Sequence, residues 1–409
     1  MTRLIILAIL YIVLTVYGFQ AIKTVFKSAW IQYLFIVIAF LVSVNLIYQF
    51  ATPSEGSVVS GGRGYAIGFL ISFMALNLVI TTILIGEDLV RSFISLYDKF
   101  FITKDSFYLP SRRKFISQVA LGLAAIPFSS LLYGMYKGRY NYKVLKYTLH
   151  FEDLPAAFDG YRLTHISDIH SGSFDNKEKI NYAVDLVNQQ KGDVILFTGD
   201  LVNNKASEMY DWKETFSKLS AKDGVFSVLG NHDYGDYVDW KSKKDQKDNL
   251  NELIAIQKEI GFDLLLNENR YIEKNGERLA IIGVENWGKG GFKKAGDLEK
   301  ASKQIDTNDF KILLSHDPSH WAEKVIDDQN HYHLTLSGHT HGMQFGIEIP
   351  GWIKWSPVQW RYKHWAGIYQ EKGQYININR GFGYLAYPGR VGIWPEITVI
   401  ELKKGTQIA

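Results

Sequence analysis

Residues 161–170 read YRLTHISDIH, a short β-forming and apolar run that ends in Asp168 and His170. Such a run predicts a buried strand followed by a polar loop. In an extended or turning segment, residues two apart point the same way, so this carboxylate and this imidazole can share one cation. One such pair alone is a weak indication of a metal site.

The same pattern recurs four more times, because residues 194–197, 225–229, 310–314 and 333–336 are also β-rich runs that end in polar clusters. Helical patterns lie between several of them, which is an α/β layout, and in such folds ligands gather at the carboxyl ends of the strands. A lone strand-end Asp or His is usually structural, but the whole series in this order predicts a metal centre. The residues at these later strand ends are Asp200, Asn231, His232, Asp233, His316, His339 and His341.

These segments resemble the signature set of the calcineurin-like metallophosphoesterases. The segments are THISDIH (164–170), FTGD (197–200), GNHDY (230–234), SHDP (315–318) and GHTHG (338–342). The likeness covers about residues 147–402. NRGFG (379–383), PGR (388–390) and PEIT (395–398) are similar to the bacterial membrane-associated or exported phosphodiesterase branch. The resemblance implies an α/β fold, a two-sheet αββα sandwich.

The resemblance also implies a dinuclear metal centre with Asp200 as the bridging ligand. Manganese is the preferred ion by family analogy, with iron, zinc or magnesium as alternatives, since nitrogen and oxygen ligands accept all of them. The sequence contains no cysteine, so thiolate ligands and cysteine nucleophiles are excluded. One ion would be bound by Asp168, His170, Asp200 and His341, and the other by Asp200, Asn231, His316 and His339.

By the same resemblance, two such cations acidify a shared water, and the hydroxide between them attacks the phosphorus atom. His232 would lie near the leaving oxygen and donate a proton, with Asp233 fixing its orientation. Three classes stay open: a phosphodiesterase, a phosphomonoesterase or lipid-linked pyrophosphatase, and a non-catalytic membrane binding or sensing protein. The non-catalytic class is least expected, because a protein without turnover has little physical reason to keep a complete two-metal site. Among the enzymes we prefer a phosphodiesterase, although the sequence does not give the cleft shape that would separate diesters from monoesters.

The first third of the chain differs sharply from the rest. Leu4 to Phe19, Ile31 to Phe50 and Tyr65 to Gly86 lack charges and are long enough to predict three membrane-spanning helices. A fourth run, about Ile116 to Tyr136, contains Pro127 and predicts either a fourth span, which we prefer, or a signal-like helix. We therefore expect a transmembrane region at 1–142 and a phosphoesterase domain at 143–409.

Basic residues predict the orientation of these spans. Lys23 and Lys27 follow the first span, and Lys99, Lys104 and residues 112–114 lie between the third and the fourth. By the positive-inside rule these loops are cytoplasmic. The protein is then expected in the inner (cytoplasmic) membrane, with its catalytic domain on the periplasmic or extracellular side. Residues 111–116 also resemble a twin-arginine export motif, or else carry ordinary flanking charges.

The segments 350–355 and 360–365 combine tryptophans with cations, as is typical of a membrane–water interface. We expect either a lipid-linked substrate at the bilayer or, alternatively, a hydrophobic lid. Arg380 and Arg390 are candidate phosphate clamps or structural ion-pair partners. The net charge of +3 gives no reason to expect a nucleic acid, and the sequence indicates no obligate protein partner.

Overall fold

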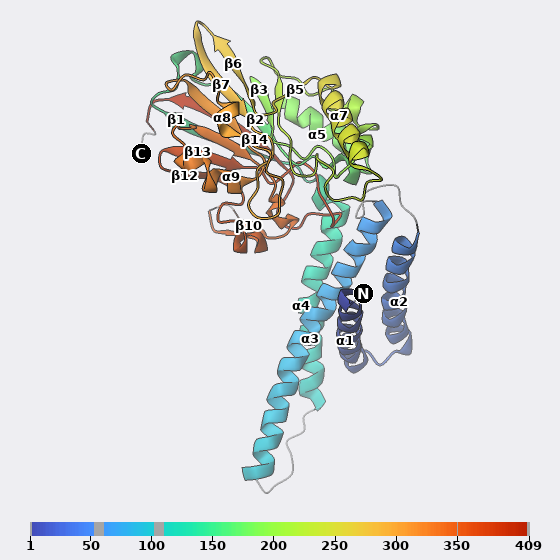
Figure 1. Ribbon diagram of the computed structural model, residues 1–409. Helices are drawn as coiled ribbons and strands as arrows, with labels where there is room; N and C mark the ends of the chain where they lie inside the picture. Colours follow the sequence, from blue (N-terminus) through green and yellow to red (C-terminus); the bar gives the residue numbers. More distant parts are fainter. Residues whose placement is uncertain (1, 53–60, 102–109, 350, 407–409) are drawn as a thin grey trace. The chain divides into compact units, whose positions relative to one another are not determined.

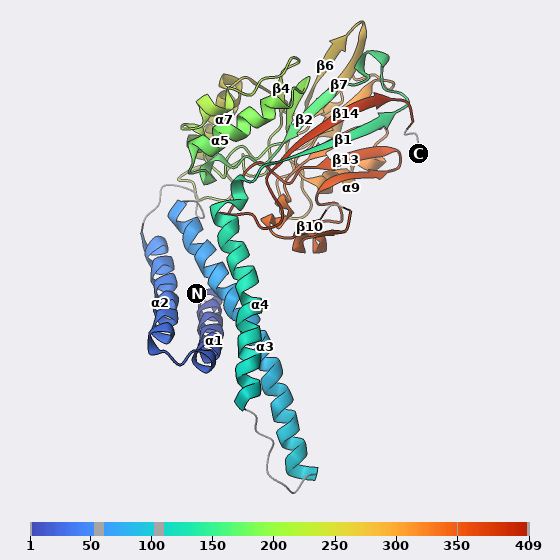
Figure 2. The same cartoon turned by 180° about the vertical axis from the view of Figure 1, so that it is seen from behind.

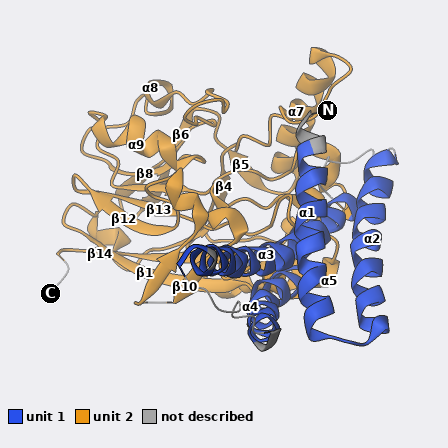
Figure 3. Ribbon diagram, turned by 90° about the horizontal axis from the view of Figure 1, so that it is seen from below, with its two compact units in different colours: residues 1–53, 62–136 blue, residues 54–61, 137–409 orange. Residues whose placement is uncertain are grey.

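The computed structural model describes residues 2–52, 61–101, 110–349 and 351–406. The chain divides into a helical unit that ends at Tyr136 and a second unit that begins at Lys137 (Figure 3). This division precedes strand β1, which begins at Lys143. The sequence boundary after residue 142 stays a prediction.

The described residues of the helical unit form four helices, each with a stretch long and apolar enough to cross a membrane. The fourth apolar run is therefore a helix of membrane-spanning length, as preferred from the sequence, and Pro127 lies within it. Small side chains such as Ala21, Ala120 and Ala124 are fully buried against Ile80 and Leu84, which allows close approach of helices in a lipid environment. The helices are α1 (Thr2–Val25), α2 (Ala29–Ala51), α3 (Gly61–Phe101) and α4 (Pro110–Tyr136).

The arginine pair of the export-like motif has partners inside this unit. Arg113 donates from Nη1 to Glu87 and Asp88 of α3, at 2.7 Å each, and Arg112 Nε lies 4.0 Å from Glu87. Acidic residues contribute little to membrane orientation, so these pairs leave the positive-inside argument unchanged. Lys104 lies outside the described residues.

The second unit is built on two six-stranded sheets (Figures 1 and 2). The order of the first is β1-β14-β2-β3-β4-β5, and that of the second is β12-β13-β9-β8-β7-β6. The first contains β1 (Lys143–Phe151), β2 (Arg162–Ile166), β3 (Val194–Phe197), β4 (Val225–Ser227), β5 (Phe262–Leu264) and β14 (Glu396–Lys404). The second contains β6 (Glu268–Lys274), β7 (Glu277–Gly283), β8 (Phe310–Leu314), β9 (Leu334–Ser337), β12 (Gly367–Glu371) and β13 (Gln374–Ile378).

The sheets pack face to face through apolar side chains that both contribute. Leu163 and Leu196 of the first sheet share one buried cluster with Ile281, Ile312 and Leu336 of the second. Alternate residues of a strand point to opposite faces, so the other faces need helices to cover them. Those helices are α5 (Lys177–Gln189), α6 (Lys213–Phe216), α7 (Lys243–Glu259), α8 (Leu298–Ala301) and α9 (Pro318–Glu323).

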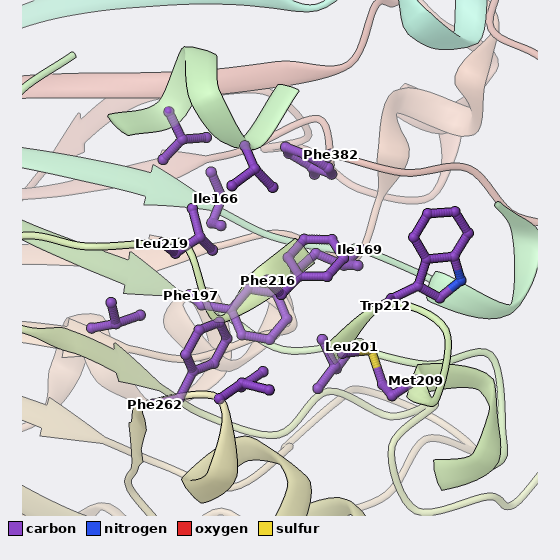
Figure 4. Close-up of a cluster of buried hydrophobic side chains, with 14 of the residues drawn as sticks. Ile166, Ile169, Phe197, Leu201, Met209, Trp212, Phe216, Leu219, Phe262 and Phe382 are labelled. Atoms are coloured by element: carbon purple, nitrogen blue, oxygen red, sulfur yellow. The ribbon is translucent and has the colours of Figure 1, made fainter. Parts of the chain in front are cut away.

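Helix α5 shows how the sequence produces this cover. Asn176 caps its first turn by accepting from Lys179 N at 3.0 Å, and apolar residues at 180, 183, 184 and 187 form one face. That face packs with Ile166, Phe197 and Phe216 in a second buried cluster (Figure 4). A third cluster includes Leu313 and Trp321 and covers the outer face of the second sheet. The layers are helix, sheet, sheet and helix, which confirms the predicted two-sheet αββα sandwich.

Strand direction brings the polar loops together. Strands β2, β3 and β4 are mutually parallel, as are β8 and β9, so the carboxyl ends within each group lie at one edge. All five runs predicted from the sequence are strands. The loops that follow them carry the residues of the site below.

Candidate metal centre

Two groups of side chains converge at these strand ends. Asp168, His170 and His341 place one ligand atom each within 4.8 Å of one another, and so do Asp200, His316 and His339. In the first group, His341 Nε2 lies 3.2 Å from Asp168 Oδ1 and 3.0 Å from His170 Nε2.

The second group includes the amide oxygen of Asn231. This oxygen lies 3.2 Å from His316 Nε2 and 2.8 Å from His339 Nδ1. A carboxamide oxygen is a hard, neutral ligand, so it complements the two imidazoles and one carboxylate. The structure thus brings together all seven residues predicted as ligands.

Asp200 lies between the two groups. Its Oδ2 atom is 3.6 Å from His170 Nε2 in the first group and 3.1 Å from His316 Nε2 in the second. Its Oδ1 atom accepts from the backbone N–H of His232 at 2.8 Å, which holds the carboxylate in this position. This geometry fits a bridging carboxylate.

The outer partners of the second group orient its ligand nitrogens toward Asp200 and Asn231. His316 Nδ1 lies 2.7 Å from the carbonyl of Thr198, which can only accept, so Nδ1 carries the proton and Nε2 faces Asp200. His339 Nε2 lies 2.9 Å from the Tyr362 hydroxyl and 3.4 Å from Asp317 Oδ2. A carboxylate behind a ligating imidazole is a common support in metal sites.

The first group has a different outer partner. Arg390 Nη2, which can only donate, lies 3.2 Å from His341 Nδ1. A cation bound at His341 Nε2 would require the imidazole proton on Nδ1, so the hydrogens of Arg390 Nη2 would then go to the carbonyls of Gly381 and Gly383. His170 Nδ1 is buried and has no hydrogen-bond partner among the described residues.

The electrostatics keep the carboxylates of both groups ionised, because the pKa values of Asp168 and Asp200 are lowered. Burial alone would raise the pKa of Asp168, but the charge and hydrogen bond of His341 outweigh it and lower this pKa. Burial lowers the pKa of His316, yet the charge and hydrogen bond of Asp200 raise it to about 10. A buried set of carboxylates and imidazoles that stabilises a proton also suits divalent cations, so the residues present fit the implied metal ions.

The backbone at the ligands is strained. Asp168, Asp200 and His339 have φ angles of 54°, 59° and 69°, and His170 and His341 both have 50°. This left-handed region is costly for residues other than glycine, and such residues cluster at functional sites. Gly230 permits the crowding, because a Cβ there would lie 2.2 Å from Asp200 Oδ1. The strain is consistent with selection for ligand geometry rather than for stability.

His232 is held differently from the prediction. Its Nδ1 lies 2.8 Å from the carbonyl of Asn203, so Nδ1–H donates there and Nε2 faces the cleft that His232 lines. The predicted orienting role of Asp233 is wrong. That carboxylate accepts from the backbone N–H groups of Gly230, Asp200 and Leu201 at 2.8, 2.9 and 2.8 Å.

Asp233 therefore ties the loop after β3 to the loop after β4. Burial and then the charge of Asp200 raise its pKa to about 7, while the backbone amides act in the opposite direction. Its role in the site is to position the backbone of Asp200.

Arg380 and Arg390 do not lie where a phosphate clamp was predicted. Arg380 donates from Nη1 to Glu396 and from Nη2 to Glu348, at 2.5 Å each. Arg390 is fully buried and donates to the carbonyls of Gly381 and Gly383. Neither arginine is among the residues that line the cleft. The ion pairs of Arg380 with Glu348 and Glu396 fit the structural alternative. Arg390 binds carbonyls instead, and its buried Nη1 has no hydrogen-bond partner among the described residues.

Replacing Arg380 by methionine is expected to lower the free energy of unfolding by about 3–5 kcal/mol, because Glu396 is left buried without its charge partner. The matched control is Lys372→Met, which removes an exposed ion pair with Asp327 and should change stability by less than about 1 kcal/mol. Thermal unfolding of both full-length variants in detergent measures the difference. Equal, small effects would contradict the structural role.

A cleft of about 440 Å³ opens over both metal groups. Asp200, Asn231, His232, His339 and His341 form its polar floor. The described wall is mainly apolar and aromatic, and its residues are Tyr237, Phe292, Met343, Pro357, Val358, Trp360, Arg361, Tyr362 and Leu385, with Thr340 between floor and wall.

Sequence reasoning missed three of these contacts. Asn231 donates to the Tyr237 hydroxyl at 2.8 Å, the Tyr362 hydroxyl meets His339 at 2.9 Å, and the Arg361 guanidinium lies 5.0 Å above the Phe292 ring. Two sequence features could have indicated some of these residues. Asp317 directly follows the ligand His316 in the SHDP motif, and Arg361 and Tyr362 lie within 360–365, a segment rich in aromatic residues and cations. Tyr237 and Phe292 lie in segments with no such signal.

Replacing Tyr362 by phenylalanine is expected to weaken metal binding about 10–100-fold, since outer partners of ligating imidazoles have effects of this size. The change removes only the hydroxyl that contacts His339 Nε2. Titration of the metal-depleted full chain with Mn²⁺ checks it, with Tyr182→Phe on an exposed part of α5 as the control. An unchanged affinity in Tyr362→Phe would show that Asp317 alone supports His339.

Comparisons with known proteins agree with this geometry. Residues 161–343 match the family model "Calcineurin-like phosphoesterase", and residues 1–139 match "Probable Calcineurin-like phosphoesterase, transmembrane domain". The metallophosphoesterase YkuE of Bacillus subtilis (strain 168) is 29% identical over 303 residues, which cover 72% of this chain and 98% of YkuE.

Two further relatives have the same kind of domain. A "Transmembrane protein with metallophosphoesterase domain" of Danio rerio is 27% identical over 67% of this chain and 60% of its own length. A metallophosphoesterase of Aquifex aeolicus (strain VF5) is 28% identical over 68% of this chain and 98% of its own length. With both domain models matched and the motif residues assembled in one site, the chain carries a calcineurin-like phosphoesterase domain, preceded by a transmembrane domain of the kind that accompanies such phosphoesterases.

Proposed function

We propose that this membrane protein is a phosphodiesterase that depends on two divalent metal ions, with manganese preferred. The position of Asp200 Oδ2 between the two imidazole groups is the observation that carries the proposal. One ion would be held by the Asp168 group and the other by the group that includes Asn231 and His316. Bound there, two cations supply an acidified water and neutralise the charge of the phosphoryl group.

The protein's own residues perform the remaining steps. In hydrolysis, the water oxygen forms a bond to phosphorus, the bond from phosphorus to the ester oxygen breaks, and that oxygen needs a proton. His232 lines the cleft beside Asp200 and Asn231, with Nδ1 committed to Asn203, so a protonated Nε2 can donate to the leaving oxygen. Asp233 accepts from the backbone N–H of Asp200 and so fixes the position of that ligand.

The cleft wall favours a diester over a monoester. Arg361 is the one lysine or arginine among the described residues of the lining, and its guanidinium carbon lies 5.0 Å from the centre of the Phe292 ring and 5.5 Å from that of the Tyr362 ring. A monoester dianion needs more positive charge around it, whereas a diester carries one negative charge and organic groups on both sides of the phosphorus. Aromatic and aliphatic walls suit those groups.

For the location of the enzyme, we propose the inner membrane with the catalytic domain on the periplasmic or extracellular side. The distribution of lysine and arginine around the four apolar helices supports this orientation. A substrate on that side would be a phosphate ester available outside the cytoplasm.

The test is metal-dependent hydrolysis by the purified full chain in detergent. The metal-depleted protein is assayed with a chromogenic phosphodiester and the matching monoester, with and without Mn²⁺. We expect Mn²⁺-stimulated cleavage of the diester and at least about tenfold lower kcat/KM for the monoester, a difference of about 1.4 kcal/mol. A higher kcat/KM for the monoester would contradict the proposed phosphodiesterase activity and indicate a phosphomonoesterase.

A further inference from the structure

A small two-stranded ribbon beside the cleft has one apolar face. Strand β10 (Ile347–Ile349) pairs antiparallel with β11 (Ile353–Trp355), so Ile347 lies opposite Trp355 and Ile349 opposite Ile353. Residues two apart on a strand share a face, and directly opposed residues do too. These four apolar side chains therefore occupy one face of the ribbon.

The other face of the ribbon attaches it to the domain. Glu348 forms the ion pair with Arg380, and its partner in the ribbon, Lys354, donates to the carbonyl of Ala366. The alternation begins earlier in the chain, because Met343 and Phe345 are exposed while Gln344 is buried. The apolar face consequently points away from the domain.

This face concentrates the exposed apolar surface of the phosphoesterase unit. Among its described residues, the large apolar side chains that are exposed outside 343–360 are all tyrosines, at 182, 210 and 237. Trp352 and Trp360 are 77% and 78% exposed. We name as the apolar rim Met343, Phe345, Ile347, Ile349, Trp352, Ile353 and Trp360. An exposed apolar cluster of this kind marks an interaction surface.

The composition of the apolar rim fits a lipid bilayer. Tryptophan is enriched at membrane–water interfaces, where its ring is apolar and its N–H is hydrated. Lys354, Arg361 and Lys363 lie in the same segment, whereas its acidic residue, Glu348, is neutralised by Arg380. The same chain carries four helices of membrane-spanning length, and only residues 137–142 separate the last of them from β1. A bilayer is thus covalently tied to this domain.

The apolar rim continues into the cleft. Met343 and Trp360 belong to both, and Val358 and Leu385 extend the apolar lining toward His341 and Asp200 on the polar floor. A molecule with its phosphate at Asp200 can keep a hydrocarbon chain on this apolar path. A small water-soluble ester makes no use of it.

We propose that the apolar rim inserts into the headgroup region of a bilayer and that the substrate is an amphiphilic phosphodiester, one esterified to a lipid alcohol. This rests on the proposed phosphodiesterase function and specifies its substrate class. The hydrolysed bond is the same as above, with the lipid part held at the rim and the polar part over the metal groups.

Insertion is tested on the full chain, which contains no cysteine and so accepts a single label site. Trp352→Cys and, as control, Tyr182→Cys are labelled with an environment-sensitive fluorophore and reconstituted in nanodiscs of phosphatidylcholine and phosphatidylglycerol. Tyr182 is 57% exposed on α5, within the same unit. We expect blue-shifted emission and quenching by nitroxide lipids at 352 and neither at 182. Identical behaviour at both positions overturns the insertion.

The substrate class is tested by activity in the same nanodiscs. The double variant Ile349→Ser, Trp352→Ser is expected to hydrolyse phosphatidylglycerol at least about tenfold more slowly than the unmodified chain. Both should cleave the soluble chromogenic diester equally, since neither residue lines the cleft. Soluble-diester turnover without any lipid turnover, or with equal lipid turnover in the variant, overturns this inference alone. Absence of soluble-diester turnover as well would overturn the proposed function.

Discussion

Asp200→Asn is expected to lower kcat for the phosphodiester at least about a thousandfold, because loss of a bound cation removes several kcal/mol of transition-state stabilisation. The amide has the same shape but no charge, while Oδ2 of Asp200 approaches imidazoles of both groups. Bound metal should fall below two ions per chain. Metal analysis and steady-state kinetics on the purified full chain measure both effects.

The matched control for this variant is Asp185→Asn, which makes the same chemical change at an exposed position on α5. It should retain metal and turnover. An Asp200→Asn protein that keeps two ions and near-normal kcat would exclude a bridging role, even if the family assignment stood.

His232→Ala is expected to reduce kcat about 10²–10⁴-fold for an alkyl ester, the usual contribution of a positioned proton donor. For a nitrophenyl ester the loss should be much smaller, because that leaving group departs without a proton. Metal content should not change, since His232 is not one of the side chains that form the two groups. The difference between the two leaving groups is the signature of proton donation.

The control here is His331→Ala, which removes an exposed imidazole outside the cleft. It should leave both rates unchanged. Equal losses for the alkyl and nitrophenyl esters in His232→Ala would contradict proton donation and would instead favour stabilisation of charge on the phosphoryl group.

The architecture was predictable because strand and loop have different residue patterns. The buried runs before Asp168, Asp200 and His316 are short, apolar and β-rich, and each ends in a polar residue at a carboxyl edge. Three of the four apolar helices were predictable from length and composition alone, while the fourth run, with Pro127, was open between a span and a signal-like helix. The two family models match the same parts of the chain, residues 1–139 and 161–343.

Other features depend on contacts that a sequence pattern does not encode. Asp233 was expected to orient its neighbour His232, but it binds backbone amides, whose positions follow from the turn after β3. The carbonyl of Asn203, rather than the Asp233 carboxylate, accepts the hydrogen bond from His232 Nδ1 and orients the imidazole. Arg380 satisfies two glutamates from separate elements, so its role depends on tertiary pairing. Tyr237 meets Asn231 through a local loop that has no characteristic spacing.

Metal stoichiometry measured together with activity shows whether hydrolysis depends on two bound ions. The purified full chain is depleted with a chelator, titrated with Mn²⁺, and assayed for bound metal and for phosphodiester hydrolysis at each step. We predict negligible turnover without metal, two ions bound per chain at saturation, and activity that follows their binding. Full turnover by protein free of divalent cations, or saturation at a single ion with full activity, would contradict the account.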